Sequence, residues 1–117
     1  MALLEIKKPV ATANVRWSTA SEGGRVSGPP TAPVYTATAV FCLGGDAETV
    51  PGWPASADQL SILVQSLGSH EDGADVSLIG FLFPDLARPH LHPGAELLIL
   101  EGPKVVAKAT IRDLIEE

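Results

Sequence analysis

Apolar and polar side chains alternate along three short segments of the chain. Every second residue is apolar in Val10–Trp17, in Val34–Leu43 and, within Val105–Leu114, from Val105 to Ile111, and many of the residues between them are Thr, Asn, Lys or Arg. A period of two places the apolar side chains on one face of a β-strand and the polar ones on the other. We therefore predict three strands, each with one face turned towards the core.

Two further segments are apolar almost throughout. In Asp75–Phe83, Leu82 and Phe83 belong to opposing apolar faces, so we expect this strand to be buried on both faces. Glu96–Leu100 is a shorter apolar strand. The Glu-Gly-Pro-Lys sequence of Glu101–Lys104 is typical of a turn, and it predicts a hairpin between Glu96–Leu100 and the last alternating segment.

The middle of the chain carries two conflicting signals. Ser56–Gln59 matches a helix capping box, and apolar residues follow it at helical spacing as far as Gly68. Ser61–Leu67 is also a short apolar run with turn residues on both sides, which is typical of a buried strand. The local pattern leaves helix and strand open for residues 56–67.

Prolines and glycines divide the sequence into short pieces. The chain has 10 prolines and 11 glycines in 117 residues, a density that interrupts long helices but leaves room for short strands. Five or six strands at this spacing indicate a small all-β barrel or sandwich. The length fits one domain spanning residues 1–117. Because only 5% of the residues are aromatic, the core should be mainly aliphatic.

The charge balance limits the classes of partner. Fourteen acidic residues against eight basic ones give a net charge of −6, and the basic residues are scattered. A domain that neutralises phosphates usually has the opposite sign, so we do not expect nucleic acid to be a main partner. The N-terminal residues do not resemble a signal peptide, and no apolar run is long enough to span a bilayer. A cytoplasmic protein without a membrane partner is the expectation.

Two motifs give the sequence a resemblance to a known family. Glu22, Gly23, Gly24 and Arg25 form an EGGR turn after the first strand, ahead of a strand that bears Tyr35. Near the end, LHPGAELLILEGPKVVAKATI combines Pro-Gly, an apolar strand, Glu-Gly and a final apolar strand. Together these features resemble the C-terminal (third) β-barrel domain of elongation factor Tu, and the resemblance covers most of the chain outside residues 44–73.

The resemblance implies a closed antiparallel barrel of about six strands, found in bacteria as a stand-alone protein. It favours a strand for Ser61–Leu67, because the family has β structure there. The phosphate-binding loop of a GTPase is absent from the sequence, so the parent activity is not implied. In the family this barrel contacts aminoacyl-tRNA and the exchange factor, and an RNA- or tRNA-contacting module is one alternative for this chain.

Loop histidines suggest a second alternative. His90 and His92 are two residues apart in PHLHPG, and His70 could join them in a metal site of a metal-dependent enzyme. Flanking prolines mark a loop, however, and solvent-facing histidines explain the pattern more simply. No Ser/His/Asp or Cys/His set has supporting context, so we expect no catalysis, metal or cofactor. Glu22 and Arg25 could form a binding pair on the loop, but we expect Arg25 to have the structural role of fixing the EGGR turn.

Binding of a protein partner is the leading hypothesis. Trp53, between Gly52 and Pro54, is either an exposed aromatic contact for a partner or a cover over one end of the barrel. Trp53, His90 and His92 are the candidate partner-binding residues. Such a module would be an accessory or immunity-type protein that neutralises a basic partner. An altered middle segment that left one strand edge exposed would also allow a homodimer.

Overall fold

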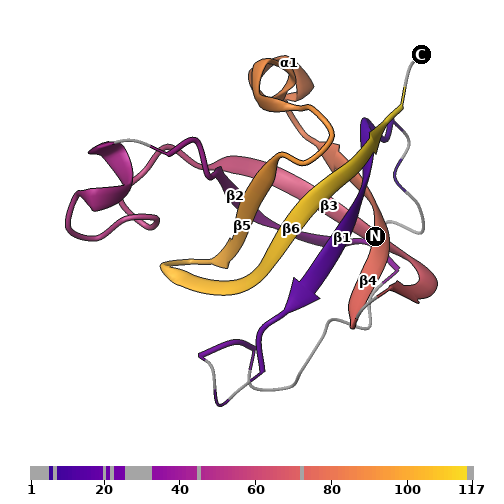
Figure 1. Cartoon of the computed structure of the whole chain (residues 1–117), viewed down its shortest axis with the longest axis horizontal. Coiled ribbons are helices and arrows are strands. Elements are labelled where there is room, and N and C mark those ends of the chain that lie inside the picture. Colours follow the sequence, from indigo (N-terminus) through magenta and orange to yellow (C-terminus); the bar gives the residue numbers. More distant parts are fainter. Residues whose placement is uncertain are drawn as a thin grey trace.

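The computed structural model of the chain describes residues 6, 8–19, 21, 23–25, 33–44, 46–71 and 73–115. Its main elements are six β-strands (Figure 1). Their bounds are β1 (Ala11–Trp17), β2 (Tyr35–Phe41), β3 (Leu60–Glu71), β4 (Ala74–Phe81), β5 (Glu96–Glu101) and β6 (Lys104–Leu114).

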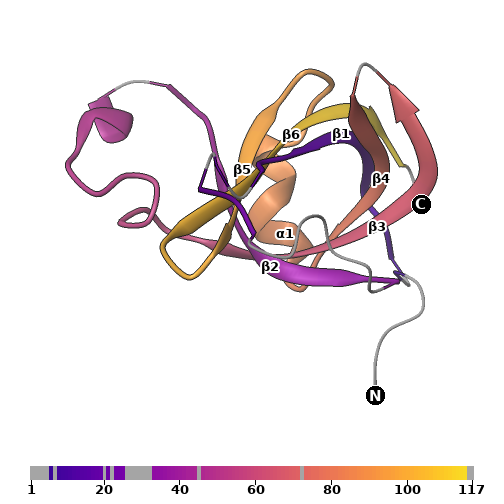
Figure 2. The same cartoon turned by 90° about the horizontal axis from the view of Figure 1, so that it is seen from below.

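The six strands close into an antiparallel barrel in the order β1-β4-β3-β2-β5-β6. Closure is made by β1, which pairs with β4 on one side and with β6 on the other. The hairpins β3–β4 and β5–β6 join neighbours in the barrel, and β2 lies between β3 and β5. Figure 2 shows the ring that results. The expectation of a small, closed, all-β barrel of about six strands is confirmed.

Short helical segments lie in the connections. The α-helix α1 (Pro84–Ala87) and the 3-10 helix η3 (Arg88–His90) link β4 to β5 and lie across one end of the barrel (Figures 1 and 2). A second 3-10 helix, η2 (Asp46–Thr49), lies in the long β2–β3 connection, which projects from the side of the barrel (Figure 1). None of the helices in the described part of the chain has the length and apolar character to cross a bilayer.

The core fills the interior of the barrel with aliphatic side chains. In β1, Ala11, Ala13 and Val15 are fully buried while the residues between them are less so, as the alternating pattern predicts. Small alanines let facing strands approach closely, and large side chains fill the remaining space. The largest fully buried side chains are Ile62, Ile79, Leu97, Ile99, Leu100, Ile111, Val15 and Val106.

The segment with conflicting signals is a strand. Ile62 and Val64 of β3 are buried, whereas their neighbours Ser61, Leu63 and Gln65 are partly exposed, so the burial has the period of a strand. β3 pairs with β2 on one side and β4 on the other, which satisfies its backbone groups without a helix. The capping-box residues precede β3 and contribute to turns instead.

The expectation that Asp75–Phe83 is buried on both faces is wrong. β4 ends at Phe81, and the side chains of Leu82 and Phe83 are 60% and 64% exposed. A closed barrel has a single interior, so only alternate residues of β4, such as Ile79 and Phe81, can be buried there. The chain then leaves the sheet because Pro84 begins α1.

Two alanine substitutions test whether only one face of the Asp75–Phe83 segment is buried. We expect Ile79→Ala to lower the free energy of unfolding by about 2–5 kcal/mol, because it opens a cavity in the core. Leu82→Ala should change it by less than about 0.5 kcal/mol, because the side chain is largely in solvent. Urea unfolding followed by circular dichroism measures both. Equal losses for the two variants would contradict the one-sided burial.

Candidate functional site

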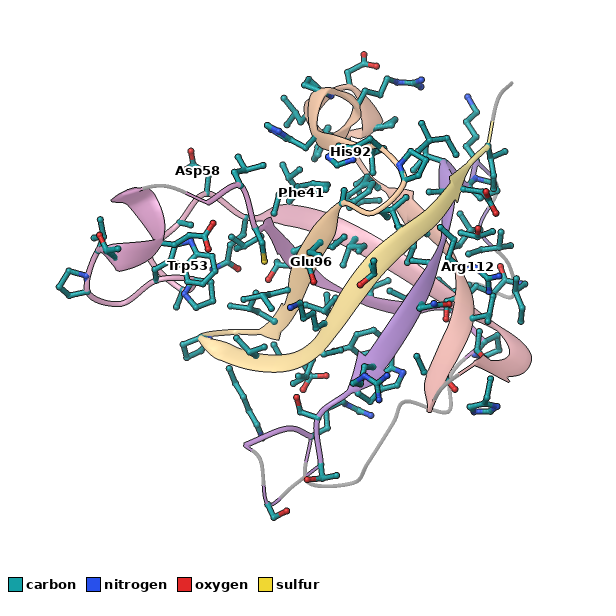
Figure 3. The ribbon with its side chains drawn as sticks, in the orientation of Figure 1. Phe41, Trp53, Asp58, His92, Glu96 and Arg112 are labelled. Carbon is teal, nitrogen blue, oxygen red and sulfur yellow. The ribbon has the colours of Figure 1, made fainter. Side chains whose placement is uncertain are left out.

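A groove of about 670 Å³ lies beside the barrel, where the β2–β3 connection and the α1–η3 segment flank β2 and the start of β3. Its floor is formed by the strands and its two walls by the connections. Figure 3 shows Trp53 on the projecting connection and Phe41 where that connection leaves the barrel. The lining as a whole is mostly apolar, and its apolar residues include Ala39, Phe41, Leu43, Trp53, Leu60 and Leu86.

Consecutive turns hold Trp53 in the first wall. Its backbone N–H donates to the carbonyl of Val50 at 3.1 Å. Just after it, the N–H of Ser56 donates to the carbonyl of Gly52 at 3.1 Å, and the chain continues as turns into β3. These bonds place the indole partly buried at the groove, rather than free in solvent.

Gln59 fastens the end of the connection to the barrel. The hydroxyl of Thr38 on β2 donates to the side-chain oxygen of Gln59 at 2.6 Å, and the amide nitrogen of Gln59 donates to the carbonyl of Ala55 at 3.1 Å. One side chain therefore joins a barrel strand to the turn that follows Trp53. The wall that carries Trp53 is fixed relative to the floor by these two bonds.

His90 and Leu86 belong to the second wall. The His90 ring packs on Phe41, with ring centroids 5.2 Å apart, and Phe41 in turn stacks on Phe81 at 6.0 Å. Leu86 lies on α1, and its side chain is 59% exposed. Leu43 also lines the groove and is 66% exposed, although the alternating pattern assigned it to the buried face of a strand. β2 ends at Phe41, so Leu43 has already left the barrel.

Acidic side chains supply the charge of the groove. Glu48 and Asp58 line it, and its described lining contains no Lys or Arg. The carboxylate of Glu48 accepts a hydrogen bond from the backbone N–H of Gly44. Cys42 lies next to the lining residue Leu43, and burial, followed by the charge of Glu48, raises the pKa of its thiol. Cys42 is thus a neutral thiol at pH 7, not an activated nucleophile.

Two of the three candidate partner-binding residues meet in the groove. Trp53 and His90, far apart in the sequence, both line it. His92 does not: its side chain is exposed, and its ring nitrogen Nδ1 lies 3.0 Å from the carbonyl oxygen of Pro93. Sequence reasoning missed Leu43, Leu86 and Asp58, because only the folded chain shows that their side chains are exposed around one hollow.

The histidines do not form the metal site considered above. β3 starts at the groove with Leu60, whereas His70 lies near its far end, roughly 30 Å away along an extended strand. There His70 pairs with Asp75, with Nε2 and Oδ1 2.5 Å apart. Among the described residues, no three His, Cys, Asp or Glu side chains are grouped so that they could hold a metal ion.

The EGGR turn lies at the opposite end of the barrel from the groove. Glu22 falls outside the described residues; Gly23 has a φ of +88°, in the left-handed region. Arg25 reaches the last residue of β5, where its Nε lies 2.8 Å from Oε2 of Glu101. The hydroxyl of Tyr35 donates to the same carboxylate oxygen, and the Arg25 guanidinium lies 5.5 Å from the centroid of the Tyr35 ring.

Trp17 extends this polar cluster across the barrel end. Its ring meets Tyr35 edge-on, with centroids 5.3 Å apart, and its indole N–H donates to Asp75 on β4 at 3.1 Å. Residues of β1, β2, β4 and β5 are therefore linked at this end. The side chains here are engaged with one another, whereas those around the groove leave apolar surface exposed.

Comparisons with known proteins do not assign the chain to a family. No protein-family model matches the chain, and no curated protein matches it in sequence.

The single tyrosine gives a direct test of the polar cluster. Burial, followed by the hydrogen bond to Glu101, raises the pKa of Tyr35 above the usual value of about 10. The stabilisation that goes with this shift is complete below pH 10 and is lost as the pH rises towards the pKa of the folded state. Tyrosinate absorbance should show folded Tyr35 ionising above the usual pKa.

The matching control is Tyr35→Phe, which cannot ionise. Its free energy of unfolding should fall less steeply above about pH 10 than that of the wild-type protein, as measured by urea unfolding at each pH. A tyrosine that titrates at its ordinary pKa in the folded protein would refute the buried contact with Glu101.

The EGGR glycines have different structural requirements. A Cβ on Gly24 would overlap the carbonyl oxygen of Ser18 and lie 2.6 Å from its carbonyl carbon, whereas one on Gly23 would meet nothing within 4 Å. We expect Gly24→Ala to lower the free energy of unfolding by about 3 kcal/mol or more. Gly23→Ala should cost about 1–2 kcal/mol, through its positive φ alone. Urea unfolding compares the two, and a larger loss at Gly23 would contradict the close approach at Gly24.

Proposed function

We propose that this β-barrel is a non-catalytic protein-binding module, an accessory protein whose partner inserts apolar side chains into the groove beside β2. The observation that carries the proposal is the exposed apolar surface around one hollow. Leu43, from the β2–β3 connection, and Leu86, from α1, line the groove and are 66% and 59% exposed, and the partly buried Trp53 lines it too.

The exposed apolar surface continues beyond the groove. Leu82 and Phe83 immediately precede α1, which carries Leu86, and both are more than half exposed. Large apolar patches are uncommon on monomeric proteins and are typical of interaction sites. A wall containing Trp and a rim containing carboxylates also match the usual composition of a binding surface, with an aromatic centre and a polar edge.

The chemistry of the groove favours binding over catalysis. His90 packs its ring on Phe41, and the nearby Cys42 thiol has a raised pKa. A nucleophile would need an adjacent base or a lowered pKa, and these contacts supply neither for Cys42. We therefore propose a role in which the groove holds a partner without transforming it.

Kinship with the third domain of elongation factor Tu is part of the proposal. It is supported by a contact between the two motifs on which the resemblance rests. Arg25 of the EGGR turn forms an ion pair with Glu101 of the Glu-Gly hairpin, across a closed six-strand barrel. A stand-alone barrel of this kind in a bacterial cytoplasm would act as an adaptor or an immunity-type protein.

Peptide selection tests the proposal. A random peptide library displayed on phage, selected against the full chain, should yield peptides that bind the wild-type protein. Leu43→Ser combined with Leu86→Ser should weaken the selected peptides at least about tenfold, because apolar contacts in the groove are lost. The matched control is Leu67→Ser, the same change at an exposed leucine of β3 outside the groove.

The outcome is read from isothermal titration of each variant with the selected peptides. Weakened binding by the double variant and unchanged binding by the control are the expected results. If no peptide is enriched, or if peptides bind the double variant as tightly as the wild-type protein, the groove is not a protein-binding site.

A further inference from the structure

We infer that the partner segment held in the groove carries Lys or Arg beside its apolar side chains; this inference rests on the proposed binding function and adds the chemistry of the partner. The groove presents a carboxylate pair, Glu48 and Asp58, on the same connection as Trp53. Figure 3 shows Asp58 and Trp53 together on this projecting connection.

The two carboxylates are not neutralised by basic residues of the groove. The described lining contains no Lys or Arg, and His90 is its one basic side chain. Basic residues on neighbouring elements pair elsewhere. Arg88 of η3 forms an ion pair with Asp85 at 3.2 Å, and Lys108 of β6 forms one with Glu96 at 2.9 Å.

Glu48 is held in place without losing its charge. Its carboxylate accepts the backbone N–H of Gly44, a neutral donor, so the side chain is oriented while the negative charge remains. Asp58 is exposed at the groove. Cationic side chains of a bound segment can therefore meet two carboxylates in the lining, Glu48, which is already oriented, and Asp58, which is exposed.

The apolar part of the inference follows from the size of the groove. A volume of about 670 Å³ lies within the range of about 300–1,000 Å³ that is usual for ligand sites. Leu43 of the β2–β3 connection and Leu86 of α1 line it, together with Phe41 and Leu60 from the strands. A segment with large apolar residues fills this space while its Lys or Arg side chains reach the acidic rim.

The same charges disfavour a second copy of the chain as the occupant. Each copy has a net charge of −6, and a groove-to-groove contact would bring the Glu48 and Asp58 carboxylates of both copies together. Like charges brought together at an interface oppose association, whereas a basic partner is attracted from a distance. The charge pattern thus selects a basic, apolar segment of another protein.

Three synthetic peptides of equal length test the inference. All contain the same Leu and Trp residues, and their remaining positions are Lys, Ser or Glu. Binding is followed by the two indole N–H signals of the isotope-labelled wild-type protein, because the chain has two tryptophans. Trp53 lies in the groove, and Trp17, hydrogen-bonded to Asp75 at the opposite end, is the internal control.

We expect the Lys peptide to bind about tenfold more tightly than the Ser peptide at low salt, with the Glu peptide weakest, and the difference to shrink as salt is added. Only the Trp53 signal should move. Asp58→Asn combined with Glu48→Gln should make the Lys and Ser peptides bind equally, and the amide introduced by Glu48→Gln would still offer an oxygen to Gly44. Asp113→Asn, which removes a charge outside the groove, should leave the difference almost intact.

The outcomes separate this inference from the function on which it rests. Equal affinity of the Lys and Ser peptides for the wild-type groove would overturn the inference and leave apolar docking standing. Failure of all three peptides to move the Trp53 signal would overturn both. A Trp53 signal that moves with protein concentration alone would identify a second copy as the occupant, and that result would also overturn the inference.

Discussion

Pairing of β1 with β6 is the constraint on which the rest of the structure depends. It joins the first strand to the last along most of their length, from Ala11 opposite Leu114 to Trp17 opposite Ala107. With this pairing the sheet has a closed interior and strands with two neighbours each. A single interior favours burial of alternate residues along each strand, and at the end of β4 it separates the buried Ile79 and Phe81 from the exposed Leu82.

Closure also gives the two ends of the barrel different characters. At one end, Arg25, Tyr35, Glu101 and Trp17 contact one another, so polar and aromatic groups are mutually satisfied. At the other, α1 lies across the barrel end and the long β2–β3 connection projects from the side, and exposed apolar side chains from both line the groove. The contacts at the first end stabilise the fold, and the exposed apolar surface at the second is the basis of the proposed function.

Much of the fold could be predicted from the sequence, because alternation is a local property. The strands bearing Ala13 and Ile111 follow from their period of two, and both residues are buried. The burial of residues in a continuous apolar run does not follow from the local pattern. Ile79 and Leu82 are both apolar residues of one such run, and only the barrel geometry explains why Ile79 is buried and Leu82 is exposed. The choice of strand for Ser61–Leu67 depends on the family resemblance, since the local pattern leaves helix and strand open.

The candidate site was less predictable, because it depends on the distance between segments. Trp53 and His90 stand out one by one from their loop contexts, and their convergence on one groove is a tertiary result. Leu86 gives no signal because its helix α1 is a single short element in a proline-rich connection.

The two hydrogen bonds of Gln59 have a consequence for how such a protein can change. Gln59 lies just before β3 and bonds to Thr38 of β2 and to Ala55 of the Trp53-bearing connection, so the connection is attached where it enters β3, and β2 and β3 pair with each other. Surface loops on a rigid scaffold tolerate substitution and insertion well. Residues between these attachment points are thus free to diversify while the scaffold is inherited unchanged. Under the proposed function, recognition and folding become separately evolvable properties of one short polypeptide.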